Sequence, residues 1–193
     1  LGRPRAEAGA EPFVTSGLHG GAFLIRREVL EELGGWDESG FLYHEDVQLS
    51  WLLQLIGADV RVVPASIVVH DYHLTMHPAK LHLLERNREA MVLSNLSLPA
   101  LIALSPLLLL TEAMMWGYCL VRGPAFLRAK LRYYGWTLRH LGRIRERRRF
   151  IRGIRRRPDR RIVRRLRWGY PWDQFLHLGK ERGLEVRREI PEG

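Results

Sequence analysis

The sequence predicts an α/β fold in its first half, followed by membrane-associated helices and basic amphipathic helices. Up to His70, short apolar or β-branched runs alternate with segments of helical periodicity. An uncharged run of 22 residues then covers Ala90–Thr111, and a basic segment extends from Arg122 to Arg167. The lone cysteine, Cys119, excludes an internal disulfide bond and a cysteine-based zinc site.

An acidic stretch leads into the best-defined helix of this first half. After Asp46 the apolar residues repeat with the i, i+3, i+4, i+7 spacing of one helix face, and they are Leu49, Leu52, Leu53 and Ile56. Gly57 predicts the end of this helix. Glu45 and Asp46 therefore lie in the first turn, where a carboxylate stays ionised and can accept a proton from a hydroxyl. The same two residues can also simply complement a helix start.

Glycines, prolines and β-branched residues predict the other elements of the first half. In chain order these are a loop over residues 1–15, a strand over Gly20–Ile25, a helix over Arg26–Leu33, and two short strands over Asp59–Pro64 and Ser66–His70. His70 ends the last strand, where strands present side chains to a site.

The net charge of +10 is unevenly distributed along the chain. Residues 122–167 hold 19 Lys or Arg and two acidic residues, a net charge of +17. The remaining residues hold 12 Lys or Arg and 19 acidic residues, a net charge of −7. An acidic globular part therefore carries a separate basic segment.

Several short motifs follow one another in the first half. They are Ser16-Gly17, Gly21-Ala22-Phe23-Leu24-Ile25-Arg26-Arg27-Glu28-Val29-Leu30, Leu33-Gly34-Gly35-Trp36-Asp37-Glu38, Tyr43-His44-Glu45-Asp46-Val47-Gln48-Leu49-Ser50, Gly57, Pro64 and His70. In this order and at these spacings they resemble the acceptor half of the inverting family 2 glycosyltransferases. Glu85-Arg86-Asn87-Arg88 is similar to the bacterial membrane-associated branch that builds cell-surface polysaccharide. The match covers Ser16–Arg88 closely and the basic tail loosely.

The resemblance implies a partial GT-A (Rossmann-like) domain that transfers a sugar from a nucleotide-sugar donor to a lipid-linked or cell-wall glycan acceptor. It implies Asp46 as the general base that deprotonates the acceptor hydroxyl, with Glu45 orienting the acceptor or Asp46. The acceptor pocket would be lined by Trp36, Asp37 and Glu38. His70 would be the third ligand of a divalent metal, Mg²⁺ or Mn²⁺, which an Asp-x-Asp pair holds on the donor diphosphate.

Simpler interpretations of the same residues stay open. Trp36 can be a core aromatic after a turn, and His70 can be a capping or packed histidine. The chain contains no Asp-x-Asp pair. We therefore expect that it is the C-terminal part of a longer enzyme whose donor half is missing here.

The apolar run at Ala90–Thr111 is long enough to cross a bilayer, but Asn95, Pro99 and Pro106 interrupt it. Broken helices in the membrane interface or a re-entrant hairpin are favoured over one true span or a buried core helix. Basic residues on both flanks indicate the cytoplasmic side. We expect association with the cytoplasmic face of the plasma membrane.

The basic segment predicts one amphipathic helix over Phe126–Ile144, suited to an anionic membrane surface. A turn over Trp168–Trp172 is a possible interfacial anchor. The expected segments are a loop (1–15), the acceptor half (16–89), an apolar membrane-associated segment (90–121) and a basic helical tail (122–193).

Two other functions stay open. The chain can be a non-catalytic membrane-bound remnant or subunit, or an arginine-rich nucleic-acid binder. No nucleic acid is expected as a partner, because aromatic residues are sparse in the basic run and no recognised RNA- or DNA-binding motif is present.

Overall fold

The computed structural model of the chain describes residues 11–40, 42–69 and 75–164, and most of these residues are helical. The elements are, in order, β1 (Phe13–Thr15), α1 (Arg27–Glu32), the short 3₁₀ helix η2 (Glu38–Gly40), α2 (Glu45–Ile56), β2 (Val60–Val62), α3 (Pro78–Asn95), α4 (Leu98–Arg122), α5 (Pro124–Arg139), α6 (Leu141–Ile154) and α7 (Asp159–Val163).

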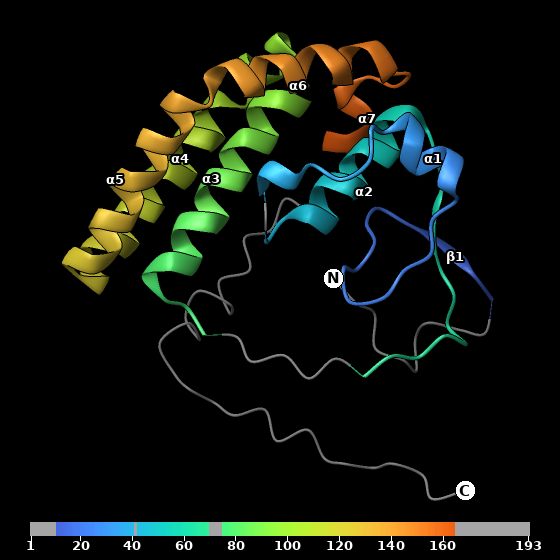
Figure 1. Cartoon of the computed structure of the whole chain (residues 1–193), viewed down its shortest axis with the longest axis horizontal. Helices are drawn as coiled ribbons and strands as arrows, with labels where there is room; N and C mark the ends of the chain where they lie inside the picture. Colours follow the sequence, from blue (N-terminus) through green and yellow to red (C-terminus); the bar gives the residue numbers. More distant parts are fainter. Residues whose placement is uncertain (1–10, 41, 70–74, 165–193) are drawn as a thin grey trace, which may run out of the picture.

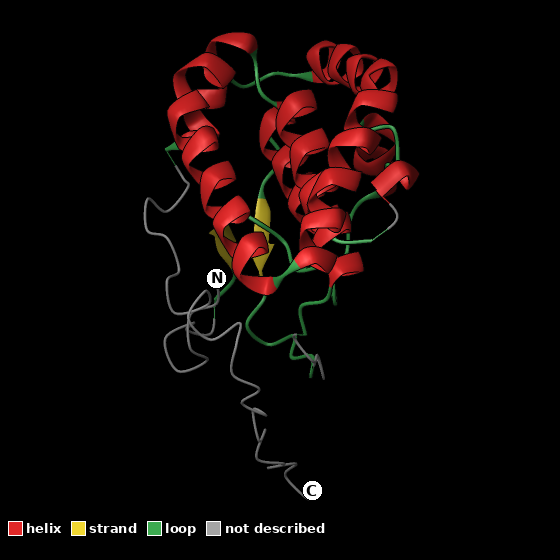
Figure 2. Ribbon diagram, turned by 90° about the vertical axis from the view of Figure 1, so that its left-hand side faces the viewer, coloured by secondary structure: helices red, strands yellow, loops and turns green. Residues whose placement is uncertain are grey.

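The helices form two groups that α6 connects. In Figure 1, α3, α4 and α5 lie side by side, and α6 runs from the end of α5 towards α1, α2 and α7. In Figure 1 the short strand β1 lies below α1, away from α3, α4 and α5, and Figure 2 shows how small the sheet is beside the helices. The fold is therefore a helical assembly with a small sheet at one edge.

Helix α2 forms as its apolar spacing predicts. It spans Glu45–Ile56, and Gly57 ends it in the left-handed conformation at φ 90°, with its N–H donating to the carbonyl of Leu53. The face predicted to be apolar is buried in a core shared by α1, α2, α6 and α7, whose buried residues are Leu33, Leu49, Leu52, Leu53, Leu55, Ile56, Ile151 and Ile162.

The predicted α/β fold is wrong. Among the described residues the sheet consists of β1 and β2 alone, paired antiparallel with Phe13 opposite Val62 and Thr15 opposite Val60. The segment of β1 was expected to be loop, and the run expected as a strand at Gly20–Ile25 is irregular. The run 66–69 is also irregular and largely exposed. A β-branched run makes a strand only where another strand pairs with it, and these runs have none in the described chain.

The apolar run after residue 90 is divided between two helices. Helix α3 ends at Asn95, and α4 begins after Ser97, whose side chain accepts a hydrogen bond from the N–H of Ala100. Pro106 lies inside α4, which stays continuous for 25 residues, or about 37 Å. By length and composition α4 could cross a membrane, and it is the one such helix in the described part of the chain.

The single amphipathic helix predicted over Phe126–Ile144 is also wrong. It is divided at His140 into α5 and α6. Lys130, expected on the polar face, is fully buried, whereas Leu131 and Leu138 are exposed. Lys130 is buried because it pairs with two carboxylates from α3 and α4, Glu85 and Glu112.

Arginines of α6, and Arg155 directly after it, hold the C-terminal ends of other helices. Arg148 donates to the carbonyl of Leu93 and Arg155 to that of Asn95, both at the end of α3. Arg147 lies 3.5 Å from the carbonyl of Leu33, just after α1. Cations at these carbonyls satisfy groups that a helix leaves unpaired and complement its dipole. Part of the basic run is therefore structural.

Candidate functional site

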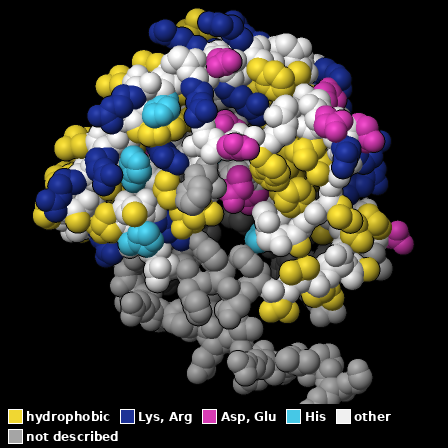
Figure 3. Space-filling model, in the orientation of Figure 1, with side chains coloured by type: hydrophobic (Ala, Val, Ile, Leu, Met, Phe, Trp, Pro, Cys, Tyr) yellow, Lys and Arg dark blue, Asp and Glu magenta, His cyan; other side chains and the backbone are white. Residues whose placement is uncertain are grey.

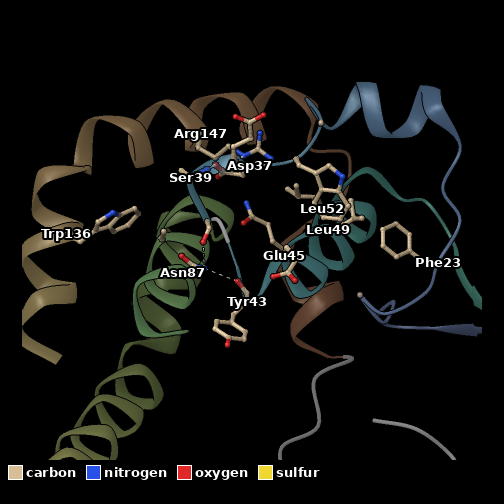
Figure 4. Close-up of a pocket in the computed structure, with 17 residues that line it drawn as sticks. Phe23, Asp37, Ser39, Tyr43, Glu45, Leu49, Leu52, Asn87, Trp136 and Arg147 are labelled. Carbon is tan, nitrogen blue, oxygen red and sulfur yellow. Dashed lines mark hydrogen bonds and ion pairs between the residues drawn. The ribbon is translucent and has the colours of Figure 1, made fainter. Parts of the chain in front are cut away.

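A cleft of about 480 Å³ opens between the start of α2 and the helices α3, α5 and α6. In Figure 4, Trp136 and Asn87 lie on one side of it, Phe23 on the other, and Glu45 between them. The lining residues come from five separate parts of the chain and are Gly20, Phe23, Gly35, Trp36, Asp37, Glu38, Ser39, Gly40, Tyr43, Glu45, Gln48, Leu49, Leu52, Asn87, Ala90, Trp136 and Arg147.

Aromatic rings form a large part of the lining. Trp36 packs against Phe23 edge to face, with ring centroids 5.9 Å apart, and 44% of Trp36 remains exposed. Trp136 lines the cleft from α5, and Arg86 lies over its ring at 5.0 Å. His140 also stacks on Trp136, with ring centroids 4.3 Å apart, so both neighbours cover that ring. The exposed indole of Trp36 offers a flat apolar surface to a ligand, while the carboxylates beside it accept hydrogen bonds.

The loop before α2 is held by one buried side chain, Asn87 of α3. Its Nδ2 lies within 2.8 Å of the carbonyl oxygens of Gly40 and Leu42 and 2.9 Å from that of Tyr43. Arg86 donates to Gly40 as well, at 3.1 Å. The loop that forms one wall of the cleft is thus fixed to α3.

The last two residues of this loop have unusual backbone conformations. Tyr43 and His44 lie in the left-handed region at φ 73° and 66°, which is uncommon for residues other than glycine. His44 is largely buried, and this burial, followed by the nearby charge of Arg88, lowers the pKa of its imidazole. Strained residues persist where the surroundings hold them, and here they set the direction in which α2 begins.

Asp37 lies at the turn that carries the acidic wall of the cleft. Its Oδ1 accepts from the N–H of Ser39 at 3.1 Å and from the Ser39 hydroxyl at 2.5 Å. Its Oδ2 lies 4.0 Å from Nε of Arg147. That Nε is buried without a hydrogen-bond partner, and burial lowers the pKa of the Arg147 guanidinium. The cleft therefore contains one cation beside its carboxylates.

Asp46 does not line the cleft. It makes the first of three hydrogen bonds between side chains of α2 and the backbone of residues 16–20, and we call this series the polar ladder. Its Oδ2 accepts from the N–H of Gly20 at 3.1 Å, and its Oδ1 accepts from the N–H of Val47 at 2.7 Å. One turn further on, Ser50 Oγ accepts from the N–H of Leu18 at 2.9 Å. A third rung joins Gln54 Nε2 to the carbonyl of Ser16 at 2.6 Å.

The spacing of this ladder has a geometric basis. Four helical residues rise about 6 Å, and two extended residues advance about 6.6 Å. An extended loop can therefore pair every second residue with every fourth residue of α2. The Gly20 rung also needs a close approach, because a Cβ at that position would lie 3.3 Å from the Asp46 carboxylate.

The structure brings together four of the six predicted site residues. Trp36, Asp37, Glu38 and Glu45 all line the cleft, whereas Asp46 stands beside it on the ladder. His70 lies outside the described residues. Within the described ranges no three His, Cys, Asp or Glu side chains are grouped so that they could hold a metal ion. The expected Mg²⁺ or Mn²⁺ site stays a prediction.

Sequence reasoning missed three residues of the site: Asn87, Trp136 and Arg147. They lie on helices distant in the chain, so no local spacing connects them to the acidic loop. One signal was present, because the polar run Glu85–Arg88 interrupts an otherwise helical apolar pattern. Such an interruption indicates a helix face that packs against polar partners.

Comparison of the chain with protein-family models, curated proteins and solved structures finds no match in any of the three. The resemblance to family 2 glycosyltransferases therefore rests on the motifs of the sequence alone.

Proposed function

We propose that the chain is the acceptor-binding part of a membrane-associated, inverting glycosyltransferase. It acts with a nucleotide-sugar donor on a lipid-linked or cell-wall glycan. The observation that supports this proposal best is the cleft itself, in which the exposed indole of Trp36 is combined with the carboxylates of Asp37, Glu38 and Glu45. Sugars present apolar C–H faces and many hydroxyls, and this lining offers a partner for each.

Two adjacent carboxylates are candidates for the base that takes the proton from the acceptor hydroxyl. The resemblance assigns this role to Asp46, while Glu45 is the one that lines the cleft. Inversion needs a single base on the face of the sugar opposite the leaving diphosphate. A divalent cation, when bound, would neutralise the charge of that diphosphate.

Amide substitutions separate these candidates. In the enzyme that carries this chain, removal of the base should lower turnover on the order of 10²–10⁴-fold. Asp46→Asn keeps an oxygen that can accept from Gly20, so the ladder survives and only proton transfer is lost. Glu45→Gln is the matched change inside the cleft. If both variants keep wild-type turnover, neither carboxylate is the base.

The membrane part of the proposal rests on α4, which is long and apolar and has Cys119 as its one buried residue. We place the protein at the cytoplasmic face of the plasma membrane, where nucleotide sugars are available. The alternative of nucleic-acid binding is less well supported. Arg147, Arg148 and Arg155 are engaged by carbonyls and carboxylates of the protein, which leaves fewer guanidinium groups for phosphates.

Acceptor binding can be tested on the purified chain with neutral di- and trisaccharides by saturation-transfer NMR. Trp36→Ala should weaken binding about tenfold, a loss of about 1.4 kcal/mol. Val47→Ala is the control, since Trp36 and Val47 are each 44% exposed and only Trp36 lines the cleft. Equal binding by the two variants, or no binding by the wild type, would contradict the proposal.

A further inference from the structure

The outer face of α4 is an apolar stripe without a single charge. Nine of its exposed residues recur every three or four positions and so fall on one side of the helix. We call them the α4 stripe: Pro99, Ile102, Ala103, Pro106, Leu109, Leu110, Ala113, Gly117 and Leu120. Leu109 is 69% exposed and Ile102 66%. A helix on a protein in water turns such a stripe towards the core, so this one is oriented for a different neighbour.

The opposite face of α4 carries its one acidic residue. Glu112 lies 2.8 Å from Lys130 Nζ and 3.3 Å from Arg88 Nη2, and it accepts a hydrogen bond from Tyr133 at 3.0 Å and another from Tyr134. These partners belong to α3 and α5. The polar face of α4 therefore packs against α3 and α5, near the middle of the helix.

The contacts of Glu112 with Lys130 and Arg88 conflict with a transmembrane position for α4. If α4 crossed a bilayer in this arrangement, Lys130 and Arg88 would enter it with their helices. Helix α5 has 16 residues, or about 24 Å, which is short of the hydrocarbon thickness. It also carries exposed charges at Arg128 and Arg132, which hydrocarbon would not accommodate.

Helix α5 extends the apolar surface instead. Leu127 packs against the cluster around Cys119, and Tyr134 stacks on Trp116 of α4. Leu131 and Leu138 share this side of α5 by their spacing, and they are 57% and 68% exposed. Exposed arginines border these leucines, and they are Arg128, Arg132 and Arg139. Over this part of the molecule Figure 3 shows Lys and Arg interspersed with hydrophobic side chains.

We infer that α4 lies flat in the interface of an anionic membrane leaflet, with the α4 stripe on the acyl chains and Glu112 turned to the protein. Leu131 and Leu138 enter the same interface, and the bordering arginines bind anionic headgroups. The occupant is an anionic lipid surface because an uncharged apolar stripe is bordered by cations alone, the pattern of a helix that lies in the headgroup region. The inference deepens the membrane part of the proposed function and is independent of the chemistry in the cleft.

The membrane depth of several positions along the α4 stripe distinguishes a helix that lies in the interface from one that crosses the bilayer. From Ile102 to Leu120 the helix advances about 27 Å. Three single-cysteine variants, Ile102→Cys, Leu109→Cys and Leu120→Cys in a Cys119→Ala background, are labelled with an environment-sensitive fluorophore. They are then mixed with vesicles of equal parts phosphatidylcholine and phosphatidylglycerol that carry quenchers at a shallow or a deep position. All three should be quenched best by the shallow quencher.

A graded profile, with Leu109→Cys deepest and the other two shallow, would show that α4 crosses the bilayer and overturn the inference. Absence of vesicle binding would do the same. Ile102→Gln with Leu109→Gln should lower vesicle binding at least tenfold, while Val69→Gln, at an 84% exposed position near β2, should not. A lipid-free dimer that these glutamines dissociate would assign the stripe to a second copy of the chain. Saccharide binding in the cleft reports separately on the proposed function.

Discussion

At the scale of single residues, Asn87 connects α3 to the wall of the cleft. One amide nitrogen with two hydrogens serves three carbonyls, those of Gly40, Leu42 and Tyr43. The last of these residues, Tyr43, and the residue after it, His44, have left-handed backbone conformations. The hydrogen bonds of Asn87 thus stabilise a backbone conformation that the loop would not keep without them.

Asn87→Asp should therefore destabilise the protein. The substitution keeps the shape of the side chain but places a carboxylate oxygen against three carbonyl oxygens. The carbonyls of Leu42 and Tyr43 lose this donor, and that of Gly40 keeps Arg86. We expect a loss of about 2–4 kcal/mol in the free energy of unfolding, measured by urea denaturation. Glu89→Gln, on the same helix, is the control. If Asn87→Asp matched the control, the amide contacts would not hold the loop.

His44 predicts a dependence of stability on acid. Because burial lowers its pKa in the folded state below the usual 6.5, the unfolded chain binds the proton first as the pH falls. The stability is present above pH 6.5 and declines as the pH drops from there towards the folded pKa. His44→Asn, which tolerates the left-handed backbone, should flatten this decline in urea midpoints measured between pH 8 and 5. Parallel curves for wild type and variant would contradict the assignment.

At the scale of elements, α6 and the residues directly after it contact the C-terminal ends of three other helices, α1, α2 and α3. Its arginines bind the carbonyls after α1 and at the end of α3, and the backbone N–H groups of Arg156 and Arg157 donate to the carbonyl of Leu55 in α2. Arg155 also pairs with Asp159 at 2.6 Å, and Asp159 accepts from the N–H of Ser97. The junction between α3 and α4 is thus fixed by α6 and α7.

Arg155→Gln should consequently cost more than the same substitution elsewhere on α6. Arg155 is mostly buried, and its loss leaves Asp159 and the Asn95 carbonyl without their cation. We expect a loss of about 1.5–3 kcal/mol in unfolding free energy. Arg152→Gln removes an exposed arginine three residues earlier and should change it by less than about 0.5 kcal/mol. Equal effects would mean that the basic run acts only through its total charge.

Local rules predicted the helices whose signals are short-range. The start of α2 at Glu45 and its end at Gly57 follow from apolar spacing and a glycine stop, and the break near Asn95 follows from the polar and proline residues there. The acidic loop was predicted to form part of a site, and in the structure it lines the cleft; its role in binding stays a prediction. These features depend on residues within a few positions of each other.

The wrong predictions concern features that depend on residues far away in the sequence. A run such as Ser66–Val69 has strand propensity, but pairing determines whether a strand forms. Lys130 was predicted on the solvent-exposed face of a helix, because its partners, Glu85 and Glu112, are 45 and 18 positions away in the sequence. Trp136 was missed for the same reason. Burial of a charge is a property of the assembled helices, not of the segment that carries it.

At the scale of the whole molecule, α5 joins the two surfaces to which we assign function. One side of it contributes Trp136 to the cleft, and the other exposes Leu131 and Leu138 beside α4. These sides are separated only by the width of one helix, about 10 Å. A glycan attached to a lipid in the membrane would therefore meet the cleft close to the surface that holds the protein there.

The ion network between α3, α4 and α5 is what keeps α4 on this assembly, and Lys130→Met tests it. Lys130 is fully buried, 2.6 Å from Glu85 and 2.8 Å from Glu112. Methionine fills a similar volume but leaves Glu85 and Glu112 with Arg88 as their shared cation, besides the hydroxyls of Tyr133 and Tyr134 on Glu112. We expect a loss of about 3–5 kcal/mol in unfolding free energy.

Two further variants show whether charge or packing causes that loss. Arg132→Met removes an exposed cation from the same helix and should change the stability by less than about 0.5 kcal/mol. Adding Glu85→Gln to Lys130→Met removes one of the unpaired carboxylates and should recover part of the stability, because the repulsion between Glu85 and Glu112 is gone. The measurement is urea denaturation followed by circular dichroism. If Lys130→Met alone were as stable as Arg132→Met, the ion pairs of Lys130 would not be what holds α4 on α3 and α5.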